Sequence, residues 1–405
     1  MLAFGRYVLS PRLHIVSEMT DAGHPQLVAH LRWGSFTLVC LAYLVATTGE
    51  QLLSPLYPTA SEELGLGVGQ AGIVFGLLTI SIAAFNLVGG LLLRRVGPSV
   101  LIRAAAAVGV VGSVTTATTH SFGQLIIGQG VLGASAGLFF PAGLQAVATL
   151  AGPARKGFAM GIYGVAFSGG LTLAAVLGAV GSSHDWRTAF WIAAGLGVAA
   201  TIGGAGHART KPVRGSHSPF SIRTVMALPT AVGTVLAVCQ YGAIPFLTTF
   251  AVLQWGLSAT SAATVLIAGR IISIVAKVIG GASADRVGAK TSARRTGLLL
   301  TLTGVAWVLL PGSMFTYALA ALFTGMVSSL GPVANVLAVE QFGNDGMALG
   351  AYRSVQIALG AAASTIIGVA GEAFGLRPTL AVATLAPLAL IWICRERRPV
   401  TLPAG

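Results

Sequence analysis

Long apolar runs follow one another along most of this 405-residue chain, and each is about 20 residues long. A helix of that length crosses the ~30 Å hydrocarbon core of a bilayer. The runs are unbroken rather than alternating in polarity, which excludes a membrane β-barrel. We predict an all-α integral membrane protein with twelve transmembrane helices, at 33–57, 69–93, 99–119, 123–149, 156–181, 188–206, 225–250, 259–283, 295–313, 315–338, 347–371 and 376–394.

The composition is typical of a membrane protein and limits the kinds of partner to be expected. Hydrophobic residues make up 55% of the chain and charged residues 9%, far from the roughly one quarter that is charged in soluble domains. The net charge is +13, but the basic residues are scattered between the apolar runs, so we expect no nucleic-acid partner. The seven His lie outside the predicted spans, so we expect no metal and no cofactor. The expected partners are a small-molecule substrate, protons and the lipid bilayer, and the chain is expected to be a monomer.

Lys and Arg gather on one side of the predicted membrane. With the N-terminus inside, 20 of the 24 basic residues fall in cytoplasmic segments, and two, Arg187 and Arg377, fall in outer loops. Because cytoplasmic segments are enriched in Lys and Arg, both termini are predicted to be cytoplasmic. The expected location is the cell membrane, crossed many times.

A nine-residue stretch occurs twice, 191 residues apart. The first copy is Gly89-Gly-Leu-Leu-Leu-Arg-Arg-Val-Gly97, and the second is Gly280-Gly-Ala-Ser-Ala-Asp-Arg-Val-Gly288. Pro141 and Pro332 keep the same offset. Paired glycines let helix ends approach closely, and the charges that follow cannot enter lipid, so each copy is predicted to be a cytoplasmic hinge.

The repeat divides the chain into two similar halves in the same orientation. We predict two pseudo-symmetric six-helix bundles, at 33–206 and 225–394. A polar, Pro-interrupted loop at 207–224 joins them, and cytoplasmic tails occupy 1–32 and 395–405. With two similar halves, the functional site is expected to lie between them.

The second copy of the repeat carries a family motif. Gly281-Ala-Ser-Ala-Asp285-Arg286-Val-Gly288-Ala-Lys290 matches the G-x-x-x-D-R-x-G-x-K loop of the major facilitator superfamily. Asp185-Trp-Arg187-Thr-Ala-Phe190 is similar to that family's W-R-x-x-F signature. Over residues 33–395 the chain therefore resembles a twelve-helix secondary transporter of this family. The resemblance implies alternating access, in which two bundles rock about a central site near the midplane.

The resemblance also implies gating residues in the two loops. We assign this role to Asp285, Arg286, Gly288, Arg94 and Arg95. Arg94 departs from the family pattern, because Asp is usual there. We expect Asp285 to meet the positive start of the fifth predicted helix near Arg155 and Lys156, and the first copy to lack such a contact.

Glu50 is an acid inside the first predicted helix, where a charge is costly unless it is paired or hydrated. Thr47, Gln51 and Ser54 share its face and form a polar stripe. One interpretation is a carboxyl that binds and releases a proton as the cavity alternates. A static ion pair with a basic residue is the other. We assign Glu50 to proton coupling.

Arg270 lies near mid-depth of the eighth predicted helix, and Lys277 follows two turns later on nearly the same face. In the repeat, Thr79 and Asn86 occupy the corresponding positions, so this face is polar in both halves and should border the central cavity. We expect Arg270 to clamp an anionic group by bidentate hydrogen bonds. A salt bridge with Glu50 is the alternative.

Other polar residues extend the predicted site. Substrate binding is assigned to Arg270, Gln240, Tyr241, Asn335, Thr79 and Asn86. A cytoplasmic vestibule is assigned to Lys277, Arg353 and Gln356. For Lys277 a structural role, and for Arg353 a purely topological one, remain open alternatives.

The predicted net charge of the cavity is positive, because one internal acid faces up to three bases, and this favours an anionic or polar solute. We expect a secondary active transporter of a small organic solute, coupled to protons through Glu50, and not an enzyme, because titratable groups are few and dispersed. A drug or metabolite:proton antiporter is the alternative, although the fifth helix lacks the Gly-Pro pair associated with antiporters. A membrane sensor stays open as well. A channel is disfavoured because two similar halves suit alternating access.

Overall fold

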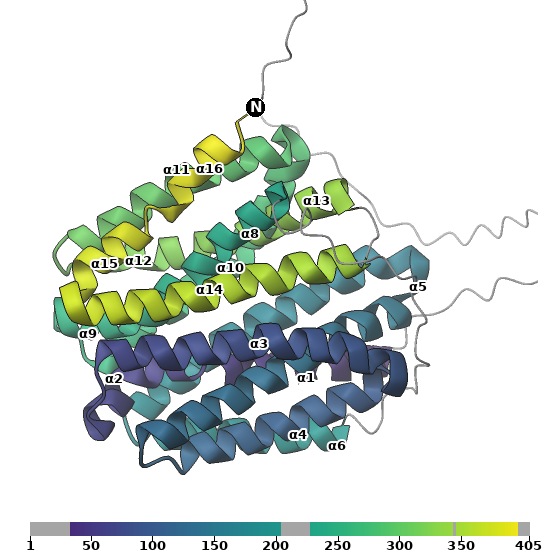
Figure 1. Cartoon of the computed structure of the whole chain (residues 1–405), viewed down its shortest axis with the longest axis horizontal. Coiled ribbons are helices and arrows are strands. Elements are labelled where there is room, and N and C mark those ends of the chain that lie inside the picture. The colour runs from purple at the N-terminus through teal and green to yellow at the C-terminus, as the bar shows by residue number, and fades with distance from the viewer. Residues whose placement is uncertain (1–32, 204–226, 343–345, 396–405) are drawn as a thin grey trace, which may run out of the picture.

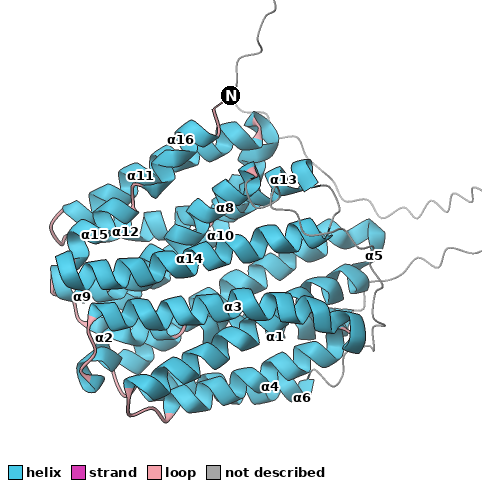
Figure 2. Cartoon of the chain, viewed as in Figure 1, coloured by secondary structure: helices cyan, strands magenta, loops and turns pink. Residues whose placement is uncertain are grey.

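The computed structural model describes residues 33–203, 227–342 and 346–395, and within them every regular element is helical (Figure 2). The predicted N-terminal tail, the predicted central loop and the predicted C-terminal tail after Arg395 lie outside these residues. The predicted all-α class is confirmed. The bilayer core holds no water to bond with the backbone, so an apolar run that crosses it must form its backbone hydrogen bonds internally, and an α-helix does this within a single segment.

The helices form two bundles, drawn in purple through blue to teal and in green to yellow in Figure 1. The first contains α1 (Trp33–Gln51), α2 (Leu53–Leu64), α3 (Val68–Val96), α4 (Pro98–Ala117), α5 (Phe122–Ser182) and α6 (Trp186–Gly203). The second contains α8 (Leu228–Ala237), α9 (Leu247–Trp255), α10 (Ala259–Val287), α11 (Ala289–Leu309), α12 (Met314–Val327), α13 (Leu330–Phe342), α14 (Gly346–Phe374), α15 (Leu376–Ala383) and α16 (Ala389–Ile393).

Ten helical segments of the described chain are long and apolar enough to cross a membrane. The other two predicted spans correspond to α6 and α11, with 18 and 21 residues. α11 begins with Lys290, Arg294 and Arg295, which make its first turns polar. Both helices have about the length that a bilayer core requires.

The helix α5 includes the fourth and fifth predicted spans together with the residues predicted to join them. The chain nevertheless reverses within α5. Phe139 and Tyr163 would lie about 36 Å apart along a straight helix. Both rings instead stack on Tyr43, with centroids 5.4 and 4.1 Å away. The two arms of α5 therefore run side by side.

Two spans are interrupted at corresponding places, and prolines explain both interruptions. α1 ends at Gln51, four residues before Pro55, and the second bundle's first span passes through a π-helical turn, Val238–Ala243, just before Pro245. Proline has no N–H to bond the carbonyl four residues earlier, so it frees the carbonyls of Gln51 and Tyr241. These two residues are related by the repeat. A broken backbone next to polar side chains therefore recurs in both bundles.

The repeated hinge adopts the same backbone in both copies. Gly97 and Gly288 have φ of 76° and 83°, a left-handed region that favours glycine. The glycines at the start of each copy permit close packing, since Gly89 lies against Leu138 and Pro141, and Gly280 against Ser329. This supports the predicted close approach of the helix ends.

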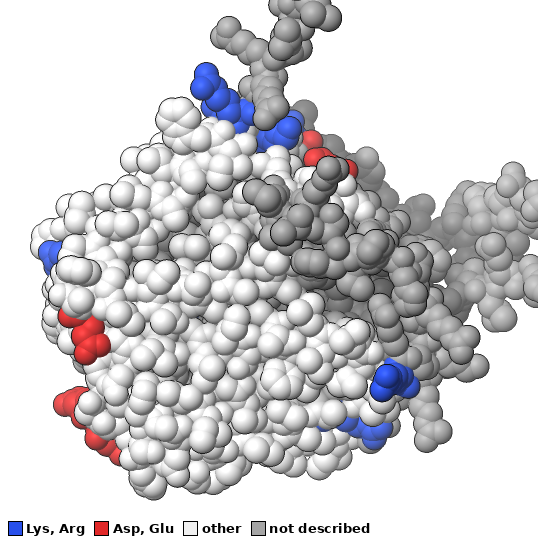
Figure 3. Space-filling model, in the orientation of Figure 1, with Lys and Arg blue, Asp and Glu red and all other residues white. Residues whose placement is uncertain are grey.

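Charged side chains cluster at the two ends of the molecule and leave the face between them nearly uncharged (Figure 3). Acids gather at one end, which we call the acidic end; its exposed acids are Glu62, Glu63, Asp185 and Glu372. Arg187 belongs to this end too, because its guanidinium pairs with Glu63 at 2.8 Å. The opposite, basic end carries exposed residues such as Arg95, Arg286 and Lys290. The topology prediction assigns the basic end to the cytoplasm.

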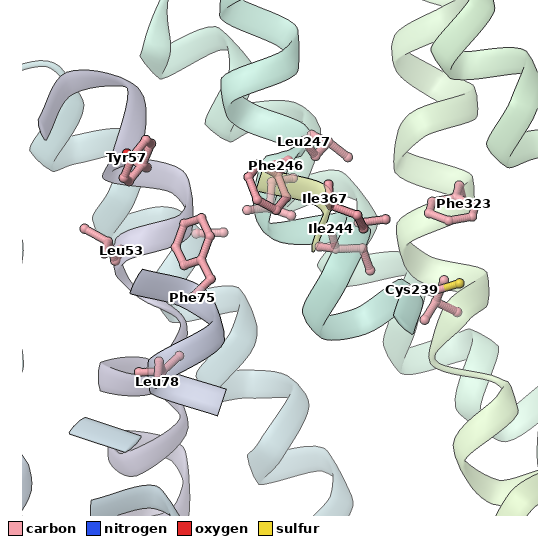
Figure 4. Close-up of a cluster of buried hydrophobic side chains, with 14 of the residues drawn as sticks. Leu53, Tyr57, Phe75, Leu78, Cys239, Ile244, Phe246, Leu247, Phe323 and Ile367 are labelled. Carbon is pink, nitrogen blue, oxygen red and sulfur yellow. The ribbon is translucent and has the colours of Figure 1, made fainter. Parts of the chain in front are cut away.

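The two bundles meet tightly toward the acidic end, where α3 and α14 run side by side (Figure 1). The Gly69 N–H donates to Glu372 Oε2 at 2.8 Å, and the Thr248 hydroxyl donates to the Ser54 carbonyl at 2.7 Å. The Phe75 and Phe246 rings pack edge to face at 5.7 Å (Figure 4). In this conformation the acidic end is closed between the bundles.

Gly137 gives a test of the helix packing within the first bundle. A side chain there would meet the backbone of Ile82 and Asn86 in α3. Gly137→Val should lower stability by about 1–3 kcal/mol, the usual cost of overpacking. Thermal unfolding in detergent measures this. The matched control is Gly164→Val, also in α5, where nothing lies within 4 Å. Equal melting temperatures for the two variants would contradict the packing described.

Candidate substrate site

A small cavity lies between the bundles. Its polar lining comes from Thr47 and Glu50 of α1 and Tyr241 of the π-helical turn, and its aromatic lining from Tyr43, Phe139, Phe140 and Phe167. About 10 Å³ is open to the centre of a water-sized sphere, roughly the room for one water. The conformation is therefore contracted around this point, where residues of both bundles meet.

Glu50, Gln51 and Arg270 form a hydrogen-bonded chain across the bundle interface. Gln51 Nε2 donates to Glu50 Oε1 at 2.9 Å, and Arg270 Nη2 donates to Gln51 Oε1 at 3.2 Å. Glu50 and Gln51 are each 7% exposed, and Arg270 is 1% exposed. Among the described residues the ion pairs are those of Arg187 with Glu63 and Asp185, so Glu50 and Arg270 are bridged by an amide rather than directly paired.

The Arg270 guanidinium is incompletely satisfied. Its Nε and Nη1 atoms are buried and have no hydrogen-bond partner among the described residues. A buried charge with unpaired donors is costly unless something else satisfies it. An anionic ligand oxygen is a group that would satisfy these donors. The predicted salt bridge between Arg270 and Glu50 is not formed in this conformation.

Lys277 and Arg353 reach across the interface to aromatic rings that line the cavity. The Lys277 ammonium lies 4.5 Å from the Phe167 ring centroid and donates to Ser168 Oγ at 2.6 Å. The Arg353 guanidinium lies 4.0 Å from the Phe140 ring centroid. Both are cation–π contacts, and both side chains are partly exposed. Neither cation has a carboxylate partner among the described residues.

The other residues assigned to substrate binding are placed less centrally. Thr79 is buried, but its hydroxyl donates to the Phe75 carbonyl of its own helix. Asn86 Nδ2 donates to Ser354 Oγ at 3.4 Å, which links α3 to α14. Asn86 thus contacts the partner bundle, and neither Asn86 nor Thr79 is among the residues that line the small cavity. For Thr79, the hydroxyl is occupied by its own backbone.

Polar residues of the second bundle also differ in their placement. Tyr241 lines the cavity, and its neighbour Gln240 is buried with its amide nitrogen unpaired. Gln356 is buried, and its side chain lies near Gly233 of α8. Asn335 is exposed on α13 and does not line the cavity. Of these predicted site residues, Tyr241 is the one that lines the small cavity, and the roles of the others stay predictions.

The gating residues lie apart from the cavity, at the basic end. Asp285, Arg286 and Arg95 are exposed, and Gly288 forms the turn described above. The side chains of Arg94, Arg155 and Lys156 lie outside the described part of the structure. The expected contact of Asp285 with the fifth helix therefore stays a prediction.

The aromatic partners of the cations were missed from the sequence. Phe140, Phe167 and Ser168 lie in stretches of α5 that carry no charge to mark them. Aromatic residues in apolar runs are common, so composition alone gives no signal. The repeat offered one signal: Gln51 and Tyr241 occupy corresponding positions, each four residues before a proline. That match identifies Gln51 as a central residue beside Glu50.

A family model described as the Major Facilitator Superfamily matches residues 39–365. The chain belongs to this superfamily. A solved structure supports the fold: a bacterial homologue of the human lysosomal transporter Spinster, in an inward-facing and occupied conformation, has a TM-score of 0.77 at 13% identity, covering 90% of this chain and 96% of that one.

Curated relatives of different kinds match a shorter part of the chain. The probable sulfoacetate transporter SauU of Cupriavidus necator is 28% identical over 41% of this chain and 39% of its own length. The multidrug transporter mfsC of Aspergillus fumigatus is 30% identical over 35% and 28%. The hexuronate transporter of Escherichia coli K12 is 27% identical over 41% and 39%. The chain thus spans about two fifths or less of the length of these relatives.

The bridge between Gln51 and Arg270 can be tested by a double-mutant cycle. Gln51→Leu should destabilise the protein by about 1–3 kcal/mol, because it removes the one hydrogen bond that the buried Arg270 side chain makes to the described residues. The same change should cost much less in an Arg270→Met background, where no cation needs the bond. Thermal unfolding of the four proteins measures the coupling. Equal costs in both backgrounds would show that the bridge does not stabilise the protein.

Proposed function

We propose that this superfamily member is a secondary active transporter of a small organic anion, working by alternating access and coupled to protons through Glu50. The observation that carries the proposal is the buried Arg270 guanidinium, with two unpaired donors at the interface between the bundles. The resemblance to transporters named for sulfoacetate and hexuronate, both organic anions, supports the same substrate class.

Arg270 is suited to bind a carboxylate or sulfonate. A guanidinium offers donors in a fixed fork that matches two oxygens of such a group. One donor already bonds to Gln51, and the remaining two unpaired nitrogens, Nε and Nη1, are free to bind. When the bundles separate, an anion entering the cavity would take up these donors. Lys277 and Arg353 add to the positive potential that attracts it.

Glu50 is suited to carry the proton because of its neighbours. The structure describes seven acids, and Glu50 is the buried one, while the others are exposed. Its carboxylate accepts from Gln51, which in turn accepts from Arg270, so the charge of Glu50 and the occupancy of Arg270 are linked through one amide. An imported proton brings about 2.3 kcal/mol per 100 mV of membrane potential, which can drive uptake.

The antiporter alternative is an efflux pump for drugs or metabolites, and one relative is named as a multidrug transporter. The site argues against a cationic drug. The cavity is lined by a single acid, Glu50, while Lys277 and Arg353 contact two of its lining rings and Arg270 bonds to Gln51, next to Glu50. An anionic metabolite could be moved outward by the same residues. The direction of transport is therefore a separate question from the substrate's charge.

Proton coupling is tested with Glu50→Gln in proteoliposomes. This variant keeps the hydrogen bond with Gln51 but cannot lose a proton. Accumulation driven by a pH gradient should be abolished, while exchange of substrate across the membrane continues. Glu62→Gln, which changes an exposed acid at the acidic end, is the matched control. If Glu50→Gln accumulates substrate as the wild type does, Glu50 is not the coupling group.

The anion clamp is tested with Arg270→Lys. Lysine keeps the charge but loses the fork, so affinity for an anionic substrate should fall at least about tenfold. Thermal shifts of purified protein across a panel of organic anions and cations measure the affinities. Arg295→Lys, at an exposed site near the start of α11, is the control. An unchanged affinity for Arg270→Lys would refute the clamp.

A further inference from the structure

We infer that the site takes a small organic dianion: one anionic group binds Arg270, and a second binds between Lys277 and Arg353. The inference rests on the proposed transport of anions and specifies the substrate's charge. It is argued from the charge balance of the cavity and from the contacts that the two outer cations make.

The charges around the cavity do not cancel. Lys277 lies within electrostatic range of both Arg270 and Arg353, and Glu50 lies within range of the same two arginines. When all four groups are charged, three cations and one carboxylate give the cluster a net charge of +2. A monoanion would leave half of that excess uncompensated in a poorly hydrated space, where unbalanced charge is costly. A dianion balances the cluster when Glu50 is ionised.

Lys277 and Arg353 are held by groups that an anion can displace. Their partners are the Phe167 and Phe140 rings and one hydroxyl, Ser168 Oγ. A cation–π contact or a neutral hydrogen bond is weaker than a charge-assisted bond to a carboxylate. Both cations therefore stay near the cavity in its contracted state, yet remain available to an incoming anionic group.

The spacing of the cations separates the two anion positions. Lys277 lies about two turns from Arg270 on α10, so their Cα atoms are about 10 Å apart along the helix axis. Arg270 is buried at the centre, whereas Lys277 and Arg353 are partly exposed. The two outer cations come from α10 and α14 and both reach α5 rings that line the cavity. One ligand with anionic groups at both of its ends can contact the inner and the outer position.

The test compares pairs of ligands that share a skeleton and differ by one negative charge. The pairs are glucarate and glucuronate, succinate and monomethyl succinate, and sulfoacetate and its methyl ester. Apparent affinities for purified wild-type protein come from thermal shifts at neutral pH. In at least one pair the dianion should bind at least tenfold more tightly than its partner. If no dianion in the panel exceeds its monoanionic partner, the inference is overturned.

Variants of the outer cations locate the second position. Lys277→Gln and Arg353→Gln should each weaken the preferred dianion about tenfold or more and leave the monoanion of that pair nearly unchanged. Lys290→Gln, which removes an exposed charge at the basic end, should affect neither ligand. Monodisperse elution and a melting temperature near that of the wild type establish that each variant is folded. A variant that fails this criterion is replaced by Lys277→Arg or Arg353→Lys, which keep the charge and should keep the preference for the dianion.

The outcomes separate this inference from the proposed function. If Lys277→Gln and Arg353→Gln weaken the monoanion and the dianion equally, the outer cations only hold the bundles together and the dianion inference fails. The clamp then still stands, provided that Arg270→Lys weakens both ligands. If Arg270→Lys changes neither ligand, the proposed anion clamp fails together with the inference.

Discussion

The central site depends on the burial of one charge. Arg270 is 1% exposed, in a span that must cross an apolar membrane, and a cation in that position is tolerated only with compensation. The compensation here is partial. The Gln51 side-chain oxygen, from the other bundle, accepts one hydrogen bond from Arg270, and the Gln51 amide nitrogen donates to the carboxylate of the preceding residue, Glu50. The arrangement holds the cation in place without neutralising it completely. A fully formed ion pair would leave less reason for the site to bind an anion.

The interrupted helices explain how this cluster fits into two packed bundles. Pro55 and Pro245 each free a backbone carbonyl beside a central polar residue, Gln51 in one bundle and Tyr241 in the other. The segments after the breaks then bond to each other, through Ser54 with the Pro245 carbonyl and Thr248 with the Ser54 carbonyl. Irregular backbone in a membrane protein is tolerated where it is buried in protein or lines a cavity. The two interrupted segments are buried in protein, and they lie next to residues that line the cavity.

The fold followed from the sequence more fully than the site did. Runs of apolar residues and the repeated hinge fixed the spans, since lipid imposes helices of a set length, and Gly97 and Gly288 adopt the same turn. The charges of Glu50 and Arg270 stand out in apolar runs, and both lie at the centre. What the sequence could not supply was the rotation of each helix. Asn335 is exposed, and the rings that hold Lys277 and Arg353 resemble any other aromatic residues in a span.

In the proposed mechanism, the distribution of charge between the bundles links anion binding to the relative motion of the bundles. All three cations, Arg270, Lys277 and Arg353, belong to the second bundle, while the groups they contact, Gln51, Phe167, Ser168 and Phe140, belong to the first. Each of these contacts crosses the interface, so parting the bundles around the cavity strips the cations of them together. A ligand that bonds to the cations replaces the contacts that the cations lose on separation. Its affinity therefore differs between the contracted and the parted states. Such a difference is the condition for a ligand to shift the balance between two conformations. Glu50 faces the same cations from the first bundle, so a proton bound there alters the attraction that draws the bundles together.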